Sequence, residues 1–292
     1  MKLEELIGNT PLIELQRIPE NPNVTIYCKL EGQNPGGSVK DRAALGMING
    51  ALERGEIKPG DKLVEATSGN TGIALAMIAA MKGLQMTLIM PESATEERKL
   101  SMKSFGAELI LTPAEKTIEY SRTVAQQMAD EEGYHLLNQF GNDDNYKMHE
   151  RTTGPEIWRD TGGKVTHFVS SMGTTGTIMG VSRYLKSQNP DIQIVGTQPT
   201  EGSSIPGIRR WSKEFLPSIF DESRVDRTID VSEEESTVMT RRMAKEEGIS
   251  GGMSSGGALT AAMKVAEGID TGVIVCITCD RGDRYLSSGL FG

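Results

Sequence analysis

Short apolar runs alternate with longer helical patterns along the chain, and this alternation constrains the fold more than any other feature. Seven runs read as strands, at residues 24–31, 62–67, 84–90, 107–112, 165–171, 192–198 and 272–279. Amphipathic stretches such as residues 114–130 and 233–247 lie between them. Strands separated by helices form parallel sheets with helices on both faces, and such buried strands are continuously apolar. The pattern therefore predicts an α/β protein.

The chain length suggests two lobes. A chain of 292 residues corresponds to about two domains. No Pro/Ser-rich linker or low-complexity tract separates two halves, so we expect the lobes to be closely connected. The polar segment at residues 138–156 is the expected crossing between them. The irregular segment at residues 200–217 is longer than a plain connection needs, and we expect it to line a site.

The overall charge and composition exclude some classes of protein. The formal net charge is −9, whereas a nucleic-acid-binding protein needs a basic face that neutralises phosphates. Residues 1–5 lack the apolar segment of a signal peptide, and no run approaches the ~18 apolar residues of a membrane helix. Three cysteines cannot all pair, which favours a reducing, cytoplasmic setting.

The cysteines and histidines do not form a recognisable metal or redox motif. Cys276 and Cys279 form a C-x-x-C, but neither a second ligand pair nor a helix start accompanies it. We therefore interpret Cys276 as a small apolar side chain in a buried strand, whereas the role of Cys279, at the strand's end, stays open. No metal spacing links the three histidines, His135, His149 and His167, so we expect them to be structural and expect no metal.

Three glycine-rich turns each precede a helical pattern. In the first, Ser68, Asn70 and Thr71 precede or open the apolar stretch 70–83. Capping explains one such side chain, whereas a helix N-terminus with several hydroxyls is also suited to a carboxylate. The second turn spans residues 173–177, Gly-Thr-Thr-Gly-Thr, and reads either as a capped glycine turn or as a phosphate cradle. It matches neither the Walker A loop nor the dinucleotide fingerprint.

The third turn, at residues 251–255, contains Ser254 and opens a helix rich in small residues. By itself it reads as a capped helix that packs closely through its glycines. Three such turns in one α/β chain suggest one ligand with several polar ends. Open α/β sheets bind ligands at the carboxyl ends of their strands.

Lys40 stands in the segment NPGGSVKDRAA, residues 34–44. It has three readings: a solvated surface charge, a phosphate ligand, or an amine that forms a Schiff base with a carbonyl cofactor. Spacing alone does not choose among them. A non-catalytic module that binds a phosphorylated ligand is the corresponding alternative to an enzyme.

Several segments in order along nearly the whole chain resemble the cysteine synthase family of fold type II pyridoxal phosphate enzymes. They are IGNTPL (7–12), KLEGQNPGGSVKDRAA (29–44), EATSGNTGIALA (65–76), SSMGTTGTIMGVSRYLK (170–186), EGSSIPGIRRW (201–211) and MSSGGA (253–258). The segments SSIPGIRRW (203–211) and CDRGDRYLS (279–287) are most similar to the B-type branch, the O-acetylserine sulfhydrylases B.

The resemblance implies a fold. Fold type II enzymes have two lobes, each with a mostly parallel twisted sheet flanked by helices, and the cofactor lies between the lobes. We expect residues 35–145 to form the smaller, mobile lobe. Residues 1–34 and 146–292 would form the larger lobe. The resemblance also implies a homodimer. The charge, the hydropathy and the cysteines described above predict a cytoplasmic protein that binds neither nucleic acid nor membranes.

The resemblance implies roles for individual residues, and each of these positions matches the family pattern. Lys40 is implied to be the Schiff-base lysine of pyridoxal 5'-phosphate, Asn70 to bind the ring oxygen, and Ser254 to face the pyridine nitrogen. The implied phosphate ligands are Gly173, Thr174, Thr175, Gly176 and Thr177. The implied ligands of the substrate carboxylate are Thr67, Ser68, Asn70, Thr71 and Gln139.

The implied activity is that of a transferase of cysteine biosynthesis. Lys40, displaced by O-acetylserine, removes the Cα proton, acetate leaves to give an aminoacrylate, and a sulfur nucleophile adds. A neutral Ser254 makes the ring a weaker electron sink than a carboxylate would, which suits β-elimination. The B-type resemblance implies that thiosulfate as well as sulfide is accepted, giving S-sulfocysteine or cysteine.

Some specifics of the reaction stay open. Arg210, with Arg209, is a candidate contact for a dianionic nucleophile, and the same two interpretations apply to Arg281 and Arg284. The alternative is that these arginines are surface or interface charges. Serine or threonine dehydratase and cystathionine β-synthase chemistry are alternative reactions on the same fold.

Overall fold

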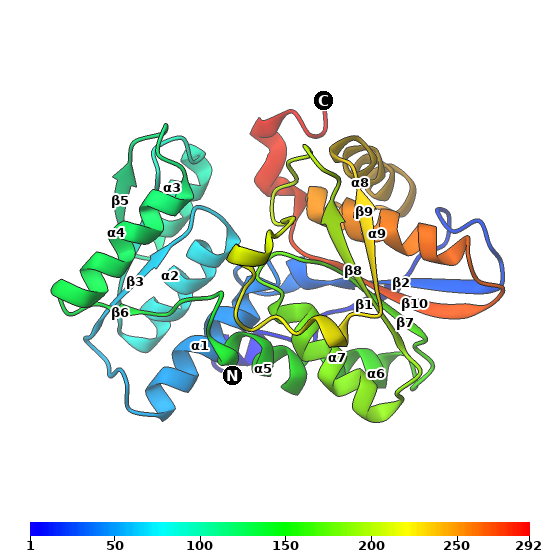
Figure 1. The fold of residues 1–292 in the computed structure, drawn as a ribbon, viewed down its shortest axis with the longest axis horizontal. Coiled ribbons are helices and arrows are strands. Elements are labelled where there is room, and N and C mark those ends of the chain that lie inside the picture. Colours follow the sequence, from blue (N-terminus) through cyan, green and yellow to red (C-terminus); the bar gives the residue numbers. More distant parts are fainter. The chain divides into compact units, whose positions relative to one another are not determined.

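The computed structural model describes all 292 residues and contains two separate sheets (Figure 1). The chain divides into two compact units, residues 40–145 and residues 3–39 with 146–292. The first unit begins at residue 40, whereas we predicted a lobe that begins at residue 35. That these units are the mobile and the larger lobe of an enzyme stays a prediction.

The smaller unit, residues 40–145, contains a fully parallel four-stranded sheet in the order β5-β4-β3-β6. Its strands are β3 (Lys62–Ala66), β4 (Gln85–Pro91), β5 (Glu108–Thr112) and β6 (His135–Leu136). Its helices are α1 (Lys40–Glu53), α2 (Asn70–Lys82), α3 (Glu96–Ser104) and α4 (Ile118–Glu131). Every residue of α2 from Thr71 to Ala79 is buried, because this helix is apolar on nearly all faces.

The larger unit contains a six-stranded sheet in the order β1-β2-β10-β7-β8-β9. Only β1 runs antiparallel to its neighbour. The strands are β1 (Leu12–Glu14), β2 (Val24–Leu30), β7 (His167–Ser171), β8 (Gln193–Pro199), β9 (Arg227–Val231) and β10 (Gly272–Thr278). The helices are α6 (Thr153–Asp160), α7 (Gly176–Gln188), α8 (Glu233–Glu247) and α9 (Met253–Ala266); α5 (Asp143–Arg151) contains the boundary between the units.

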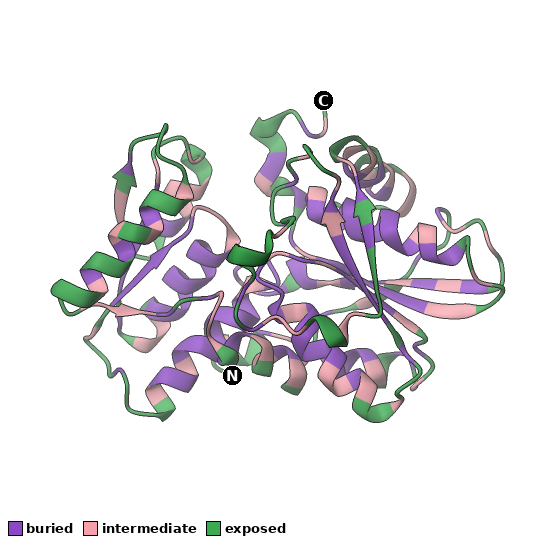
Figure 2. Ribbon diagram, in the orientation of Figure 1, coloured by how far each residue is buried: buried purple, intermediate pink, exposed green.

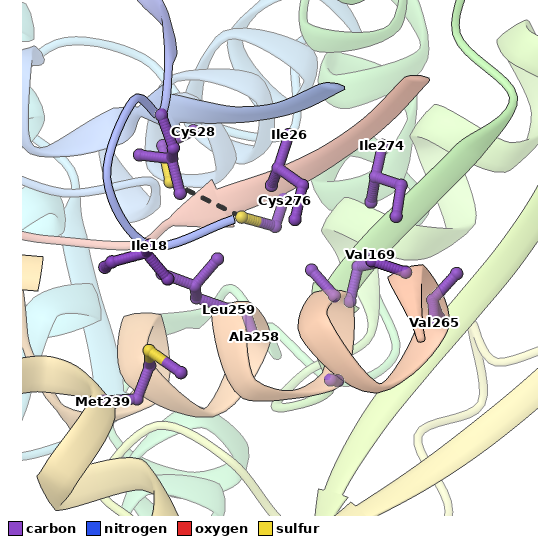
Figure 3. Close-up of a cluster of buried hydrophobic side chains, with 14 of the residues drawn as sticks. Ile18, Ile26, Cys28, Val169, Met239, Ala258, Leu259, Val265, Ile274 and Cys276 are labelled. Atoms are coloured by element: carbon purple, nitrogen blue, oxygen red, sulfur yellow. Dashed lines mark hydrogen bonds between the residues drawn. The ribbon is translucent and has the colours of Figure 1, made fainter. Parts of the chain in front are cut away.

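Two apolar clusters fill the larger unit. The first packs α8 and α9 against the sheet, and Figure 3 shows Val169, Leu259 and Ile274 within it. The second cluster packs α6 and α7 against the same strands. Figure 2 shows the resulting burial. The central strands are buried, whereas the outer faces of the surface helices are exposed.

Cys28 and Cys276 belong to the first cluster. They are register partners on the neighbouring strands β2 and β10, and their sulfur atoms lie 3.5 Å apart (Figure 3). Both cysteines are free and buried, and the hydrogen bond with Cys28, together with burial, raises the pKa of the Cys276 thiol. Cys276 is therefore an apolar core residue, as the strand pattern predicts. No helix has the length and apolar character needed to cross a membrane.

The seven expected strands all form, each within two residues of its predicted ends. Three further strands, β1, β6 and β9, were missed. Residues 200–217 contain only a short 3-10 turn, Lys213–Phe215, as their irregular composition predicts. The unit boundary at residues 145–146 lies inside the polar segment 138–156.

Candidate active site

The first group of site residues lies where β3 ends and α2 begins, in the smaller unit. We call residues 66–71 the carboxylate turn. Gly69 is the N-cap of α2, and no side chain caps the helix. The first N–H groups of an uncapped helix attract an anion, because they lack intrahelical partners and lie at the positive end of the helix dipole. The capping interpretation of Ser68, Asn70 and Thr71 is therefore wrong.

Gln139 lies against this turn although it is far away in the sequence. The Thr71 hydroxyl donates to Gln139 Oε1 at 2.9 Å, and Asn145 Nδ2 donates to the Gln139 carbonyl at 2.8 Å. Gln139 and Thr71 are both buried. The structure thus groups Gln139 with the carboxylate turn, as the resemblance implies.

Glu65, the last residue but one of β3, is a site neighbour that sequence reasoning missed. It is buried, and its Oε2 has no hydrogen-bond partner. Burial raises the pKa of Glu65 to about 7, although the N–H groups of Asn138 and Gln139 and the charge of Arg122 oppose the shift. Glu65 therefore holds the segment that carries Gln139. The sequence feature that could have identified Glu65 is a carboxylate within the apolar run of β3.

The second group lies in the larger unit, where β7 ends and α7 begins. We call residues 173–177 the phosphate turn. Thr175 is the N-cap of α7 in a left-handed conformation, with φ 70°, and its side chain does not cap the helix. Its Oγ1 is buried without a partner. A buried unpaired hydroxyl is costly, and a strained non-glycine residue is typical of functional sites.

Residues 207 and 211 pack closely against the phosphate turn. A Cβ on Gly173 would lie 2.6 Å from the Gly207 carbonyl oxygen, so only glycine fits there. Trp211 Nε1 donates to the Gly173 carbonyl at 2.8 Å. Residues 200–217 therefore contact the turn through Gly207 and Trp211.

His149 also lies beside the phosphate turn. Its Nε2 is 3.4 Å from Thr177 Oγ1, and its Nδ1 is 2.9 Å from Thr153 Oγ1. It is buried. These contacts give His149 a supporting position next to the turn. No group of three or more His, Cys, Asp and Glu side chains is arranged to hold a metal ion.

Ser254 lies in the first turn of α9, near the phosphate turn. Its carbonyl accepts a hydrogen bond from Ser171 Oγ at 2.7 Å, at the end of β7. A Cβ on Gly207 would lie 3.5 Å from Ser254 Cβ. Gly207 thus contacts both Gly173 and Ser254, and the larger unit brings these implied cofactor ligands together.

Lys40 is the first residue of α1 and is half-buried. The preceding residue, Val39, donates its N–H to the Cys279 carbonyl at 2.8 Å. The chain that leads into Lys40 is therefore anchored to the end of β10. A lysine on an anchored helix start is not a freely solvated first-turn charge, although geometry alone does not separate its two functional readings.

Arg210 contacts the ends of β8 and β9. Its Nε donates to the Pro199 carbonyl at 2.8 Å, and its Nη2 pairs with Asp230. Arg209 lies over the Trp211 ring, with 5.4 Å from the guanidinium carbon to the ring centre. Arg281 Nε is 3.5 Å from Asp283, and Arg284 donates to the Gly36 carbonyl. Contact of any of these arginines with a nucleophile stays a prediction.

A family model described as "Pyridoxal-phosphate dependent enzyme" matches residues 3–280. The chain belongs to this family. It is 58% identical over 289 residues to Cysteine synthase B of Pseudomonas aeruginosa, covering 99% of this chain and 97% of the relative. It is 57% identical over 290 residues to Cysteine synthase B of Escherichia coli, covering 99% and 96%.

Solved structures of the same family share the fold. A cysteine synthase from Entamoeba histolytica superposes with a TM-score of 0.93 at 39% identity, covering 99% of this chain and 90% of that one. An O-ureido-L-serine synthase has a TM-score of 0.94 at 35% identity, covering 99% and 94%. The fold is therefore that of fold type II pyridoxal phosphate enzymes, and pyridoxal phosphate is the cofactor.

The residues present fit this cofactor. A phosphate needs several donors at one point. The Gly176 N–H donates to Thr174 Oγ1 at 3.4 Å, but the side chain of the N-cap Thr175 does not cap α7, so the helix start supplies N–H groups together with the unpartnered Thr175 hydroxyl. The approach of Gly173 to Gly207 leaves the turn without a side chain at that position. These features explain why the turn tolerates a buried hydroxyl and a strained threonine, since an anion satisfies the former and the surrounding contacts hold the latter.

Proposed function

We propose that this enzyme is a B-type cysteine synthase, which converts O-acetylserine and sulfide to cysteine and acetate. The observation that carries the proposal is the carboxylate turn, where an uncapped helix start, Thr71 and Gln139 form one buried polar group. Such a group suits the carboxylate of an amino-acid substrate. Support also comes from the curated relatives, which are cysteine synthases B at 57–58% identity over 99% of this chain.

Different residues of the chain have different roles in the reaction. Bound pyridoxal phosphate supplies an electron sink that permits loss of the substrate's Cα proton and its acetate. Thr67, Ser68, Asn70 and Thr71 of the carboxylate turn, with Gln139, bind and orient the substrate carboxylate. Lys40 holds the cofactor at rest, and its amine accepts the Cα proton once the substrate has displaced it.

The bonds balance over the whole reaction. The Cβ–O bond of O-acetylserine breaks and acetate leaves with the electron pair, while Lys40 holds the Cα proton. Hydrosulfide then forms the Cβ–S bond, and Lys40 returns the proton to Cα. Ser254 offers the ring nitrogen a neutral hydroxyl, and the phosphate turn holds the cofactor in place.

The sulfur donor is the finer part of the proposal. We propose that thiosulfate replaces sulfide as an alternative nucleophile, giving S-sulfocysteine. Arg210 and Arg209 are the proposed contacts of the dianion, which requires Arg210 to exchange its pairing with Asp230. We also propose a cytoplasmic homodimer. Three free cysteines agree with a reducing compartment.

The first experiment tests Lys40. The purified enzyme is reduced with borohydride, digested and analysed by mass spectrometry, and we expect the reduced cofactor on the peptide that contains Lys40. Lys40→Ala removes the base and should lower kcat by about 10³-fold. The control is Lys62→Ala, an exposed lysine at the start of β3 in the same unit, which should leave kcat unchanged.

The same preparation tests the donor. O-acetylserine is supplied with sulfide, thiosulfate or homocysteine, and the products are identified by mass. Cysteine and S-sulfocysteine are the expected products. Cystathionine as the main product, or pyruvate without a sulfur product, would contradict the proposal in favour of cystathionine β-synthase or dehydratase chemistry. Cysteine without S-sulfocysteine would overturn only the thiosulfate assignment.

A further inference from the structure

A buried carboxylate, Asp280, lies just beyond the end of β10, where three segments of the larger unit meet. It is 1% exposed. Its Oδ1 accepts a hydrogen bond from the Gly252 N–H at 3.1 Å, and its Oδ2 accepts one from the Tyr285 hydroxyl at 2.6 Å. Its backbone pairs with Ser38 in an isolated antiparallel bridge. None of these contacts belongs to the site residues that the sequence implied.

The first segment held by Asp280 is the start of α9. Gly252 is the N-cap of this helix, two residues before Ser254. A Cβ on Gly252 would lie 2.5 Å from the Tyr285 ring and 2.6 Å from Asp280 Oδ1, so a side chain at this position would displace one of these two residues. On the other side of Ser254, Ser255 Oγ accepts the Cys279 N–H at 2.9 Å. Residues 279 and 280 thus hold the chain both before and after Ser254.

The second segment is the one that leads into Lys40. Ser38 pairs with Asp280, and Val39 donates its N–H to the Cys279 carbonyl at 2.8 Å. Val39 is covalently bonded to Lys40. The same two residues at the end of β10 therefore anchor the backbone beside both Ser254 and Lys40.

The third segment is the C-terminal one. Tyr285 lies in the 3-10 helix Gly282–Ser288 and is buried. The Gly282 N–H donates to the Ser250 carbonyl at 3.1 Å, just before the same turn. The C-terminal segment is therefore bonded to the chain before Ser254 in two ways. Gly282 bonds it directly to Ser250, and Tyr285 is linked to Gly252 through Asp280.

We propose that Asp280, supported by Tyr285, is a positioning residue that sets the Ser254 hydroxyl and the entry to Lys40 for the cofactor. This inference rests on the proposed function. Asp280 acts through Gly252 and Ser38, because both of its carboxylate oxygens already accept hydrogen bonds from the protein. A buried charged acceptor is difficult to replace, since its loss leaves buried donors without partners.

Four variants separate positioning from general stability. Asp280→Ala leaves the Gly252 N–H and the Tyr285 hydroxyl without this acceptor. Asp280→Asn keeps an oxygen for Gly252, and its amide donates to the Tyr285 oxygen. Tyr285→Phe removes one donor only. The matched control is Asp283→Asn, an exposed carboxylate in the same segment that pairs loosely with Arg281 at 3.5 Å.

The first readout is the affinity of the folded apoenzyme for pyridoxal phosphate, measured by fluorescence titration. We expect Asp280→Ala to weaken binding by about 10-fold or more and Tyr285→Phe by about 3-fold, as loss of a buried hydrogen bond implies. Asp280→Asn should recover most of the affinity, and Asp283→Asn should match the wild type. If Asp280→Ala does not fold, the affinities of Tyr285→Phe and Asp280→Asn are compared with those of the wild type and Asp283→Asn.

The second readout needs no cofactor. Hydrogen exchange of the apoenzyme should be faster in the peptide that covers residues 250–256 in Asp280→Ala and Tyr285→Phe, and unchanged in the peptide of α7. Variants that lose thermal stability but keep wild-type cofactor affinity and exchange would overturn the inference. A wild-type chain that binds no pyridoxal phosphate would instead overturn the proposed function, whereas the exchange comparison would still test the contacts of Asp280.

Discussion

Single residues in this protein show backbone strain and unusual burial beside the implied site residues. Thr175 combines φ 70° with a buried hydroxyl that has no protein partner. Glu65 is a buried carboxylate next to the carboxylate turn, in a strand whose other buried residues are apolar. Neither feature stabilises the unit by itself, because a buried polar group without full partners costs free energy. The proposed function accounts for both, because it requires donors for the cofactor phosphate and a fixed Gln139 for the substrate carboxylate.

Glu65 makes stability depend on pH. The pKa of its carboxyl is raised from 4.5 to about 7 by burial. Between these values the folded protein keeps a proton that the unfolded chain has lost, so the free energy of unfolding decreases as the pH rises from about 4.5 to 7. This contribution is fully present below pH 4.5 and lost above pH 7, and it amounts to at most about 3 kcal/mol.

The test compares urea unfolding at pH 5 and pH 8. Glu65→Gln cannot ionise, so its loss of stability between the two pH values should be smaller than that of the wild type by about 2 kcal/mol. Glu108→Gln, an exposed carboxylate at the start of β5, is the control and should follow the wild type. Equal pH dependence in Glu65→Gln and wild type would show that Glu65 is already ionised at pH 5.

Elements of this fold are specified partly by local signals and partly by packing. The helix α8 begins with a capping box, in which the Glu235 N–H donates to Ser232 Oγ at 3.1 Å and the Ser232 N–H donates to Glu235 Oε2 at 2.7 Å. The sequence signature S-x-x-E predicts such a start, and α8 has its predicted bounds. The neighbouring helix α9 has no side-chain cap at its start. Its position depends on tertiary packing, because its small residues allow close contact with α8.

Gly256 is the position where this approach is closest. A Cβ there would overlap the Ser236 carbonyl oxygen and Thr240 Oγ1 of α8. We expect Gly256→Ala to separate the helices, to lower the free energy of unfolding by about 1–3 kcal/mol, and to weaken cofactor binding, because Ser254 lies two residues away. Thermal unfolding and cofactor titration measure both effects.

Gly268 supplies a control just beyond the same helix. The nearest atom to an added Cβ there is 3.6 Å away, an ordinary contact. Gly268→Ala should therefore leave stability and cofactor binding nearly unchanged. Similar losses in the two variants would mean that the effect comes from replacing a glycine backbone rather than from the contact with α8.

At the scale of the whole molecule, the proposed homodimer has a candidate surface near the N-terminus. Leu3, Leu6 and Ile13 are 46%, 47% and 41% exposed, and Ile13 lies in β1, an edge strand of the larger unit. Exposed apolar side chains near a sheet edge are typical of interaction surfaces. A second copy of the chain would cover them.

Sedimentation equilibrium tests this surface. We expect a mass of twice 31.7 kDa for the wild type and an increased monomer fraction for the double variant Leu6→Glu and Ile13→Glu. Leu286→Glu, at a position 72% exposed in the C-terminal 3-10 helix, is the control and should remain dimeric. A wild-type monomer at micromolar concentration would contradict the dimer, and an unchanged dimer in the double variant would place its interface elsewhere.

The sequence by itself determined the fold class, because the alternation of apolar runs and amphipathic stretches repeats along the chain and requires no distant partner. Segments such as residues 29–44 and 170–186 also indicated the family and the cofactor. The strands β1, β6 and β9 were not predictable in this way. They are short or polar, as in Arg227–Val231, and they form only because a neighbouring strand offers a free edge.

Only the tertiary structure decided which residues support the site. Thr71 and Gln139 are 68 positions apart, and Asp280 and Gly252 are 28 apart, so no local pattern relates the members of either pair. The desolvation that makes Glu65 unusual and the contacts that hold Asp280 arise from packing between distant segments. Sequence periodicity reports local backbone preference, whereas burial and hydrogen-bond partners exist only once the chain has folded.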